Sequence, residues 1–317
     1  MTVSVLVPVY GVEKYIARCA QSLFEQTYKD IEYIFVNDCT PDRSIALLRE
    51  VAAHYPHRQP QIHIVCNERN MGLGATRARA VSLATGFALM HVDSDDCLPT
   101  DAVELLARQM QATGADMVDG AYQEVGKKGL SATTPPTPIG NPRKYLRRVL
   151  CQNIVANHVW ARLYKRTLYT GHGINMLPGI DYGEDYSVIP RLLFFAQRTT
   201  IDCTVYYYNT ANLSSYTNNM SEKHAVSYLK ANQVVYDFFT THDTQATYRT
   251  ALHIGMLNAV RTIRRNQLPM QLVNTWLQYQ PKGWICRLIW QAFMRPWPYK
   301  VANGLYLLYR KLYLLTH

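Results

Sequence analysis

Short apolar runs and amphipathic stretches alternate along the first hundred residues. The runs are typical of strands covered on both faces, and the stretches between them repeat apolar residues at the three-to-four-residue spacing of a helix. The predicted strands are residues 3–9, 31–36, 62–66 and 87–92, and the predicted helices are residues 13–26, 44–53 and one that follows the loop at 67–74. Strands alternating with helices in this way predict an α/β domain with a mostly parallel sheet. The ends of the first, second and fourth strands should then meet at one edge of that sheet.

The rest of the chain changes from this pattern to a helical one. The middle part predicts strands at 116–124 and 199–209, a Thr- and Pro-rich surface loop at 133–138, and helices at 141–151 and 186–195. Pro190 lies inside the second of these helices and predicts a kink or an end there. The last third is helical by spacing alone, over residues 225–240, 248–265, 270–278, 284–294 and 301–315.

The fourth predicted strand runs directly into three carboxylates, Asp93, Asp95 and Asp96. Ligands of open α/β sheets bind at the carboxyl ends of the strands, so chemistry is expected here. Like charges this close repel one another unless a cation, hydrogen bonds or solvent offset the repulsion. Oxygen ligands on a loop suit Mg²⁺ or Mn²⁺, whose remaining positions can take substrate phosphates. The alternative is a solvated turn that caps a helix starting near Pro99, and these residues alone leave both interpretations open.

Polar residues suited to a nucleotide follow other strands of the predicted sheet. Asp38 could accept the imide N–H of a uracil ring or cap the next helix, a role that Thr40 could fill instead. Arg77 could reach a diphosphate or pair with one of the strand-end acids. It follows a loop in which Gly72 and Gly74 are not part of a Walker A sequence, because no Gly-Lys-Ser/Thr ending is present.

Four of these segments together carry a family resemblance. They are V3-S-V-L-V-P-V-Y10 with Glu13 downstream, V36-N-D-C-T-P-D-R-S44, N70-M-G-L-G-A-T-R77 and A84-T-G-F-A-L-M-H-V-D-S-D-D96. In this order and at this spacing they resemble the nucleotide-sugar-binding half of the family 2 glycosyltransferases of GT-A type. The resemblance implies a GT-A fold, which is a Rossmann-like, mostly parallel sheet flanked by helices, here with a helical carboxyl-terminal region. The expected catalytic domain is 1–220, with its nucleotide-sugar-binding half at 1–98 and its acceptor half at 99–220. The helical spacing and the charge of the remaining residues predict a basic helical region at 221–317.

The resemblance assigns roles to residues of the first three segments. Pro8, Tyr10 and Glu13 would border the base and ribose, Asp38 would read the uracil, and Arg77 would lie near the base and diphosphate. Two positions depart from the family pattern. Asn37 stands where the first of two aspartates is usual, and Gly11 stands where asparagine is frequent.

The fourth segment contains the D-x-D sequence of the family. The resemblance implies that Asp95 binds a divalent metal directly and that Asp93 lies nearer the ribose and completes the metal site. Ser94, between them, is expected to contact the nucleotide sugar. The expected cofactor is Mg²⁺ or Mn²⁺.

Two later segments resemble the acceptor side of the family. N157-H-V-W-A-R-L-Y-K-R166 keeps Trp160 and has Arg162 in place of the usual lysine. Trp160 is either a core aromatic or a wall for the sugar. The Glu184-Asp185 pair follows the metal motif by about 90 residues, as in the family, where it supplies the base that deprotonates the acceptor hydroxyl. Asp185 is the expected base, with Glu184 orienting the acceptor or acting as base in its place, whereas an isolated Glu-Asp pair at a helix start would simply favour the helix dipole.

The predicted function is therefore inverting transfer of a sugar, expected from a UDP-sugar, to an acceptor hydroxyl. The expected acceptor is a growing, lipid-linked glycan in cell-surface polysaccharide synthesis. The alternative is a nucleotidyltransferase, or a nucleotide-binding module without turnover. A nucleotidyltransferase would release pyrophosphate, whereas a glycosyltransferase releases a nucleoside diphosphate.

Composition places the expected enzyme in the cytosol. The chain is 48% hydrophobic, enough for a substantial core, and its seven cysteines are scattered without a C-x-x-C pair. This usage suits a reducing compartment and predicts no zinc site. The amino terminus shows no basic region or small-residue cleavage site, so no signal peptide is expected. No uninterrupted apolar run reaches the roughly 18–20 residues that span a bilayer.

Charge is distributed unevenly and points to an anionic partner. The chain has 33 Lys and Arg against 23 Asp and Glu, but ten of the basic residues and none of the acidic ones lie from Thr244 onward. Basic amphipathic helices with Trp and Tyr tend to lie in the membrane interface. We therefore expect a protein that is peripheral on the cytoplasmic face of the membrane, with the helices packed on the catalytic domain as the alternative. No nucleic-acid recognition motif accompanies the charge, so no nucleic acid is expected, and a homo-oligomer is left open.

Overall fold

The computed structural model describes residues 1–127, 129–152, 154–212 and 220–316. The chain forms two compact units, each assembled from segments that are separate in the sequence. The first comprises Met1–Ile139, His158–Gly179 and Phe195–Ser215, and the second comprises Gly140–Asn157, Ile180–Phe194 and Tyr216–His317. The second unit thus begins well before residue 221 and includes two segments that the sequence analysis grouped with the acceptor half.

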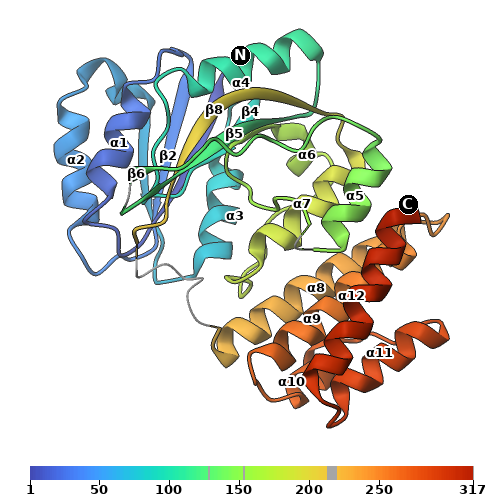
Figure 1. The fold of residues 1–317 in the computed structure, drawn as a ribbon. Helices are drawn as coiled ribbons and strands as arrows, with labels where there is room; N and C mark the ends of the chain where they lie inside the picture. The colour runs from blue at the N-terminus through green and yellow to red at the C-terminus, as the bar shows by residue number, and fades with distance from the viewer. Residues whose placement is uncertain (128, 153, 213–219, 317) are drawn as a thin grey trace. The chain divides into compact units, whose positions relative to one another are not determined.

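One mixed sheet organises the first unit (Figure 1). Its strand order is β3-β2-β1-β4-β7-β5-β6, with β8 beside β5. The strands are β1 (Val3–Val9), β2 (Ile31–Asn37), β3 (Ile62–Cys66), β4 (Ala88–His91), β5 (Met117–Gly126), β6 (Gly129–Leu130), β7 (Arg162–Lys165) and β8 (Arg198–Asn209). Strands β1 to β4 pair in parallel, whereas β7 runs antiparallel to both β4 and β5. The predicted α/β fold with a mostly parallel sheet flanked by helices is confirmed.

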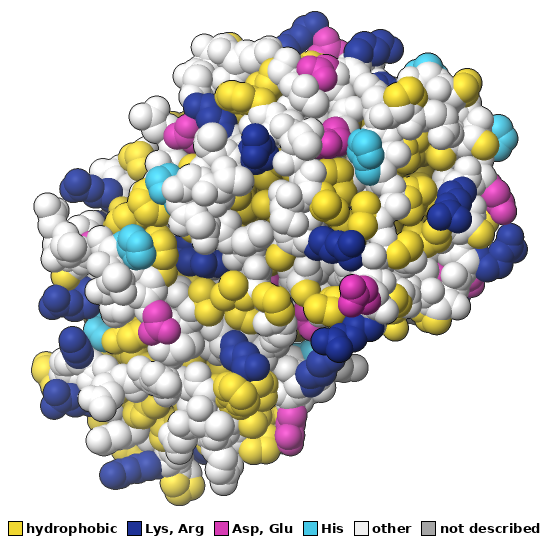
Figure 2. All heavy atoms as spheres, turned by 180° about the vertical axis from the view of Figure 1, so that it is seen from behind, with side chains coloured by type: hydrophobic (Ala, Val, Ile, Leu, Met, Phe, Trp, Pro, Cys, Tyr) yellow, Lys and Arg dark blue, Asp and Glu magenta, His cyan; other side chains and the backbone are white. Residues whose placement is uncertain are grey.

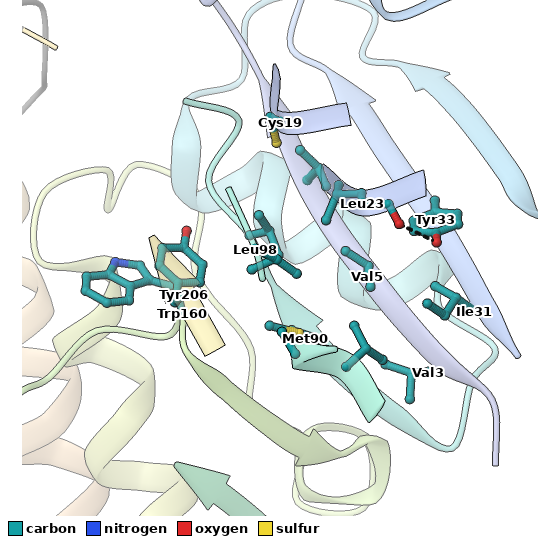
Figure 3. Packing of buried hydrophobic residues seen from close by; sticks show 14 of the residues in the cluster. Val3, Val5, Cys19, Leu23, Ile31, Tyr33, Met90, Leu98, Trp160 and Tyr206 are labelled. Atoms are coloured by element: carbon teal, nitrogen blue, oxygen red, sulfur yellow. Dashed lines mark hydrogen bonds between the residues drawn. The ribbon is translucent and has the colours of Figure 1, made fainter. Parts of the chain in front are cut away.

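Helices of the first unit cover the sheet with apolar faces. They are α1 (Ile16–Phe24), α2 (Ser44–Ala53), the 3₁₀ helix η1 (Pro56–Gln61), α3 (Leu73–Leu83), α4 (Ala102–Thr113) and α6 (Arg166–Thr170). Helix α1 buries residues at helical spacing, among them Cys19 and Leu23, in the core that also contains Val5 (Figure 3). The hydroxyl of Tyr33 donates to the Leu23 carbonyl at 2.7 Å, which satisfies the one polar group of that buried ring.

Among the described residues of the second unit, the regular elements are all helices. They are α5 (Pro142–Leu150), α7 (Glu184–Phe195), α8 (Glu222–His242), α9 (Arg249–Arg265), α10 (Gln271–Trp276), α11 (Trp284–Met294) and α12 (Tyr299–Thr316). Helix α9 is almost wholly buried along its length and packs against α5, α8, α11 and α12. Pro190 does not end α7, because the helix continues to Phe195.

Hydrophobic patterning missed strand β7, as it missed β6, η1 and α6. Strand β7 contains only four residues, yet it lies between β4 and β5, with Tyr164 opposite Leu89 and Leu163 opposite Val118. A strand this short carries too few positions for its alternation to be recognised. Its position in the sheet explains why the segment around Trp160 is buried.

Gly120 on β5 offers a test of this packing. A Cβ at this position would meet Cγ2 of the buried Val205 at 2.3 Å. We expect Gly120→Ala to lower the free energy of unfolding by about 1–3 kcal/mol, because a well-packed sheet face cannot accept the extra methyl group. Denaturant unfolding would measure this change. Gly140→Ala is the control, since a Cβ there meets nothing within 4 Å, and equal stability of the two variants would contradict the packing described.

Candidate functional site

Three parallel strands end at the same edge of the sheet and carry the predicted site residues there. In the register of the sheet, Val9 at the end of β1 lies beside Asn37 at the end of β2, and Leu6 lies beside His91 at the end of β4. The residues that follow β1, β2 and β4 are therefore neighbours in space, as the sequence predicts. Pro8 is buried within β1, and Tyr10 directly after this strand has 51% of its surface exposed.

Asp38 holds the loop that leads into α3. Its carboxylate accepts hydrogen bonds from the backbone N–H groups of Met71 and Gly72 at 2.7 and 2.9 Å, and from the Asn67 side-chain amide at 2.7 Å. Gly72 adopts φ +86°, a left-handed conformation that favours glycine. Asp38 is only 4% exposed, and its three donors come from this loop rather than from α2. A carboxylate has about four lone-pair positions, so one acceptor position remains for a ligand.

Replacement of Asp38 tests this role. We expect Asp38→Ala to cost about 1–2 kcal/mol of stability, because the Met71 and Gly72 amides lose their acceptor, and to weaken nucleotide binding as the loop loosens. Thermal unfolding and UDP titration would measure the two effects. Glu68→Ala removes an exposed acid from the same segment and is the matched control. Wild-type UDP affinity in the Asp38 variant would contradict the assignment.

The two departures from the family pattern, Gly11 after β1 and Asn37 at the end of β2, both form a hydrogen bond with Thr40. The Asn37 side-chain oxygen accepts from the Thr40 N–H at 2.9 Å, a task for which asparagine and aspartate are equally suited. The Gly11 N–H donates to the Thr40 hydroxyl at 2.8 Å, and Gly11 has φ +68°. The exposed Glu13 accepts from the Arg43 N–H at 3.2 Å, which ties it to the segment just before α2.

Arg77 on α3 is buried and paired with the first aspartate of the D-x-D sequence. Its guanidinium Nη2 lies 2.5 Å from Oδ1 of Asp93, and the two side chains are 3% and 26% exposed. The neighbouring Arg79 instead donates to the Asn67 side-chain oxygen and the Cys66 carbonyl. The structure shows the pair with a strand-end acid, and a contact of Arg77 with a diphosphate stays a prediction. A planar guanidinium held this way also keeps a fixed positive charge at the strand edge.

The remaining two aspartates differ in environment. Asp95 accepts from the Asn212 side-chain amide at 2.8 Å, and burial, together with the charge of Asp93, raises its pKa. Asp96 is completely buried and accepts from the Asn209 N–H and the Tyr206 hydroxyl, both at 2.7 Å. Burial and then the charges of Asp93 and Asp95 raise the pKa of Asp96 to about 8. Asp96 therefore fastens the loop to β8, and the D-x-D pair is the part open to a ligand.

The two D-x-D carboxylates fit a divalent cation that is completed by other ligands. Among the described residues, no group of three or more His, Cys, Asp and Glu side chains could hold a metal ion. Mg²⁺ and Mn²⁺ sites with one or two carboxylates take their remaining oxygens from substrate phosphates and water. Burial, and after it the charge of Asp93, raises the pKa of Asp95, and a cation bound beside this carboxylate would favour its ionised form. Ser94, between the two, is buried.

Trp160 packs as a core aromatic, which is one of the two interpretations that its segment left open, and its contact with the sugar stays a prediction. Its ring is 8% exposed and stacks on His158 at 3.5 Å between centroids. It also stacks on Tyr206 at 4.7 Å (Figure 3) and on Tyr208 at 5.1 Å, and Tyr122 meets it edge-on. Trp160 is therefore packed among other aromatic rings of the first unit.

Glu184 and Asp185 are the first two residues of α7 and belong to the second unit. Glu184 is 9% exposed, and Asp185 is more exposed than Glu184. Burial and the nearby Glu184 charge raise the pKa of Tyr182. The positive end of a helix dipole favours ionised carboxylates in the first turn, which suits a group that has to accept a proton.

Several residues that support the site were not predicted. Asn212 contacts Asp95, Asn67 contacts Asp38, and Tyr206 binds both Asp96 and the Asp93 N–H. The sequence analysis assigned no such contact to any of them, because each lies far along the chain from the aspartate that it contacts. The β-prone run at 199–209 was the one available signal, and it predicts a strand rather than a contact with the aspartates.

Comparison with known proteins gives a consistent result. The model of the glycosyl transferase family 2 matches residues 4–172. A putative glycosyltransferase EpsH of Bacillus subtilis is 28% identical over 289 residues, covering 86% of this chain and 81% of the relative. The uncharacterized glycosyltransferase EpsJ of the same organism is 28% identical over 286 residues, covering 86% and 77%.

Two solved structures share the fold. Residues 1–349 of Staphylococcus aureus TarS, in complex with UDP-GlcNAc, align with a TM-score of 0.59 and 18% identity, covering 84% of each chain. The mannosyltransferase PcManGT from Pyrobaculum calidifontis, in complex with GDP-Man and Mn²⁺, aligns with a TM-score of 0.50 and 16% identity, covering 98% of this chain and 87% of the other.

Proposed function

This chain belongs to glycosyl transferase family 2, and we propose that it moves a sugar from a UDP-sugar to an acceptor hydroxyl with inversion of the anomeric centre. The glycosyltransferase activity follows from the family, whereas the nucleotide, the stereochemistry and the acceptor are proposals. The complex of TarS with UDP-GlcNAc supports a nucleotide sugar as the donor substrate. Inversion by direct displacement needs no covalent nucleophile on the enzyme.

The main support for this proposal is the arrangement of residues at the carboxyl ends of the strands in the first unit. The loop held by Asp38, the Arg77–Asp93 pair and the Asp95–Asn212 contact all follow strands or helices that end at this edge. Asp38 has an acceptor position for the N–H of a uracil base, and Tyr10 offers an exposed ring beside it. A nucleotide whose base lies toward Asp38 would therefore extend its diphosphate toward the D-x-D carboxylates.

Asp95, assisted by Asp93, would hold Mg²⁺ or Mn²⁺ together with oxygens of the diphosphate. Such a cation would neutralise the charge that develops on the leaving diphosphate. Asn212 orients the Asp95 carboxylate, and Arg77 holds Asp93, so both carboxylates are fixed before a ligand arrives. The Mn²⁺ complex of PcManGT supports the use of a divalent metal.

Asp185 is the proposed base that removes the proton of the acceptor hydroxyl. It is the more exposed member of the pair at the start of α7, and a base must be reachable by the acceptor. Glu184 is the more buried member and is proposed to orient the acceptor or Asp185 itself.

The proposed acceptor is a lipid-linked glycan of cell-surface polysaccharide synthesis, and the proposed location is the cytoplasmic face of the membrane. Support comes from the ten cations without an acid after residue 243. Across the described ranges, every helix is too short or too polar to traverse a bilayer. The expected lack of a nucleic-acid partner and the open question of a homo-oligomer stay predictions.

A product assay tests the proposal. The protein would be incubated with a panel of UDP- and GDP-sugars and Mn²⁺, and release of nucleoside diphosphate would be followed. UDP release from one UDP-sugar is the expected outcome. Pyrophosphate release would instead identify a nucleotidyltransferase, and nucleotide binding without any product would identify a binding module.

A further inference from the structure

Large hydrophobic side chains are exposed along the last two helices. Trp284 is 75% exposed, Leu315 72%, Leu308 56% and Leu312 54%. Single exposed apolar residues are normal on the surface of a soluble protein, whereas contiguous groups of them indicate a surface that contacts another protein or a membrane.

On α12 the exposed apolar residues occupy one face. Val301, Leu308, Leu312 and Leu315 recur at intervals of seven, four and three, which places them in one stripe of an α-helix. The opposite face carries the buried Ala302, Tyr306 and Tyr313. The helix is therefore apolar on both sides, and only one of those sides is covered by protein.

Helix α11 repeats this arrangement. Trp284 and Leu288 are exposed at a spacing of four, whereas Ile289 and Phe293 are buried. Helices α11 and α12 contact each other and lie side by side in the second unit (Figure 1). The short connection between them exposes a further aromatic residue, Trp297, at 40%.

Cations accompany these exposed apolar residues. Arg287, Arg295, Lys300 and Lys311 are all exposed, and no acidic residue occurs in the sequence after Asp243. Figure 2 shows the molecule from the side opposite to Figure 1, where basic, acidic and hydrophobic side chains are interspersed. The surface formed by Trp284, Arg287, Leu288, Arg295, Trp297, Lys300, Val301, Leu308, Lys311, Leu312 and Leu315 is called the α11–α12 face below.

We propose that the α11–α12 face docks on an anionic lipid bilayer, with its Trp and Leu side chains inserted at the headgroup level and its cations among the phosphates. Trp favours this interface, and Lys and Arg near anionic lipid add attraction that salt screens. The helices lie in the plane of the interface, in agreement with their amphipathic pattern. The proposal rests on the membrane association proposed above, and not on the sugar-transfer chemistry.

Charge decides between a bilayer and a second copy of the chain. A two-fold interface brings the same patch of each copy together, so this face would meet its own cations without any acid to pair them. Like charges across an interface disfavour association. An anionic lipid surface supplies the missing negative charge along the whole face.

Co-sedimentation with vesicles tests the proposal, using full-length protein and vesicles of equimolar phosphatidylcholine and phosphatidylglycerol. Leu308→Glu combined with Leu312→Glu places two acids on the α11–α12 face. This variant should lose at least about tenfold in the vesicle partition coefficient. Leu130→Glu combined with Ile139→Glu is the matched control, because those side chains are 60% and 55% exposed on the first unit. The control should bind vesicles as the wild type does.

Further readouts separate the outcomes. Circular dichroism should show both variants folded, and donor hydrolysis without vesicles should be equal in both, so that loss of docking is distinct from failure of the proposed chemistry. Wild-type binding that persists on pure phosphatidylcholine and at high salt would overturn the role of the cations. Unchanged vesicle binding by the Leu308→Glu, Leu312→Glu variant would overturn the proposal. A wild-type dimer that does not bind vesicles and that becomes a monomer in this variant would also overturn it.

Discussion

Asp95→Ala is expected to abolish sugar transfer while leaving the fold intact. Among the described residues, the contact that ties this carboxylate to the rest of the unit is the Asn212 amide, so its loss affects little of the core. What disappears is the proposed anchor for a cation that stabilises the leaving diphosphate. That stabilisation is worth several kcal/mol, and a loss of about 4 kcal/mol corresponds to a rate reduction of about 10³.

The matched control for this prediction is Asp101→Ala. Asp101 is exposed at the start of α4, and its side chain makes no capping hydrogen bond to the helix. This variant removes the same charge near the same segment and should keep wild-type activity. Mn²⁺ binding in the presence of UDP, followed by the paramagnetic resonance of the ion, should be lost in Asp95→Ala and kept in Asp101→Ala. Retained transfer by the Asp95 variant would show that this carboxylate is no metal ligand.

The fold of the first unit could be predicted from hydrophobic patterning because its four parallel strands are short apolar runs separated by helices. Strands β1 and β3 begin and end at the predicted residues. Parallel pairing then fixes which strand ends are neighbours, so the edge that carries Asp38 and Asp93 follows from the order of elements alone. The arrangement of β7 could not be predicted, because an antiparallel insertion depends on contacts between residues far apart in the chain.

The side-chain contacts at this edge of the sheet could not be predicted from the sequence, for the same reason. Asp38 was expected to face a ligand, yet it also organises the loop before α3 through two backbone amides. Asp96 looks equivalent to Asp93 and Asp95 in the sequence, and only the contacts from β8 show that it is a buried structural residue. The spacing of residues in the sequence predicts which residue types come together at the edge of the sheet. Their burial in the structure shows which of them stabilise the fold and which are available to a ligand.

Trp160 illustrates how burial separates two roles that sequence leaves equal. An aromatic residue before a strand suits both a core and a sugar-binding wall. Its segment leads directly into β7, which has neighbours on both sides, and its ring is packed against other rings from this region. We therefore expect substitution of Trp160 to lower the stability of the first unit.

Asp185→Asn is expected to lower kcat by about 10²–10⁴ while leaving the KM for the sugar nucleotide nearly unchanged. Asparagine keeps the shape of the side chain but cannot take up a proton at neutral pH. Because the change lies in the first turn of α7, it also weakens a favourable interaction with the helix dipole by about 0.3–1 kcal/mol, which is too little to unfold the unit. Steady-state kinetics and unfolding measured on the same preparation would separate the two effects.

Glu184→Gln decides which member of the pair is the base. If Asp185 takes the proton, the Asp185 variant should lose the fall in kcat at acidic pH, whereas Glu184→Gln should keep that fall and lose less activity. The opposite pattern would assign the base to Glu184. An orienting role raises the KM for the acceptor, because the hydroxyl is bound less well before it reacts. Wild-type kcat in both variants would refute a base at the start of α7, and the acceptor proton would then have to leave through another group.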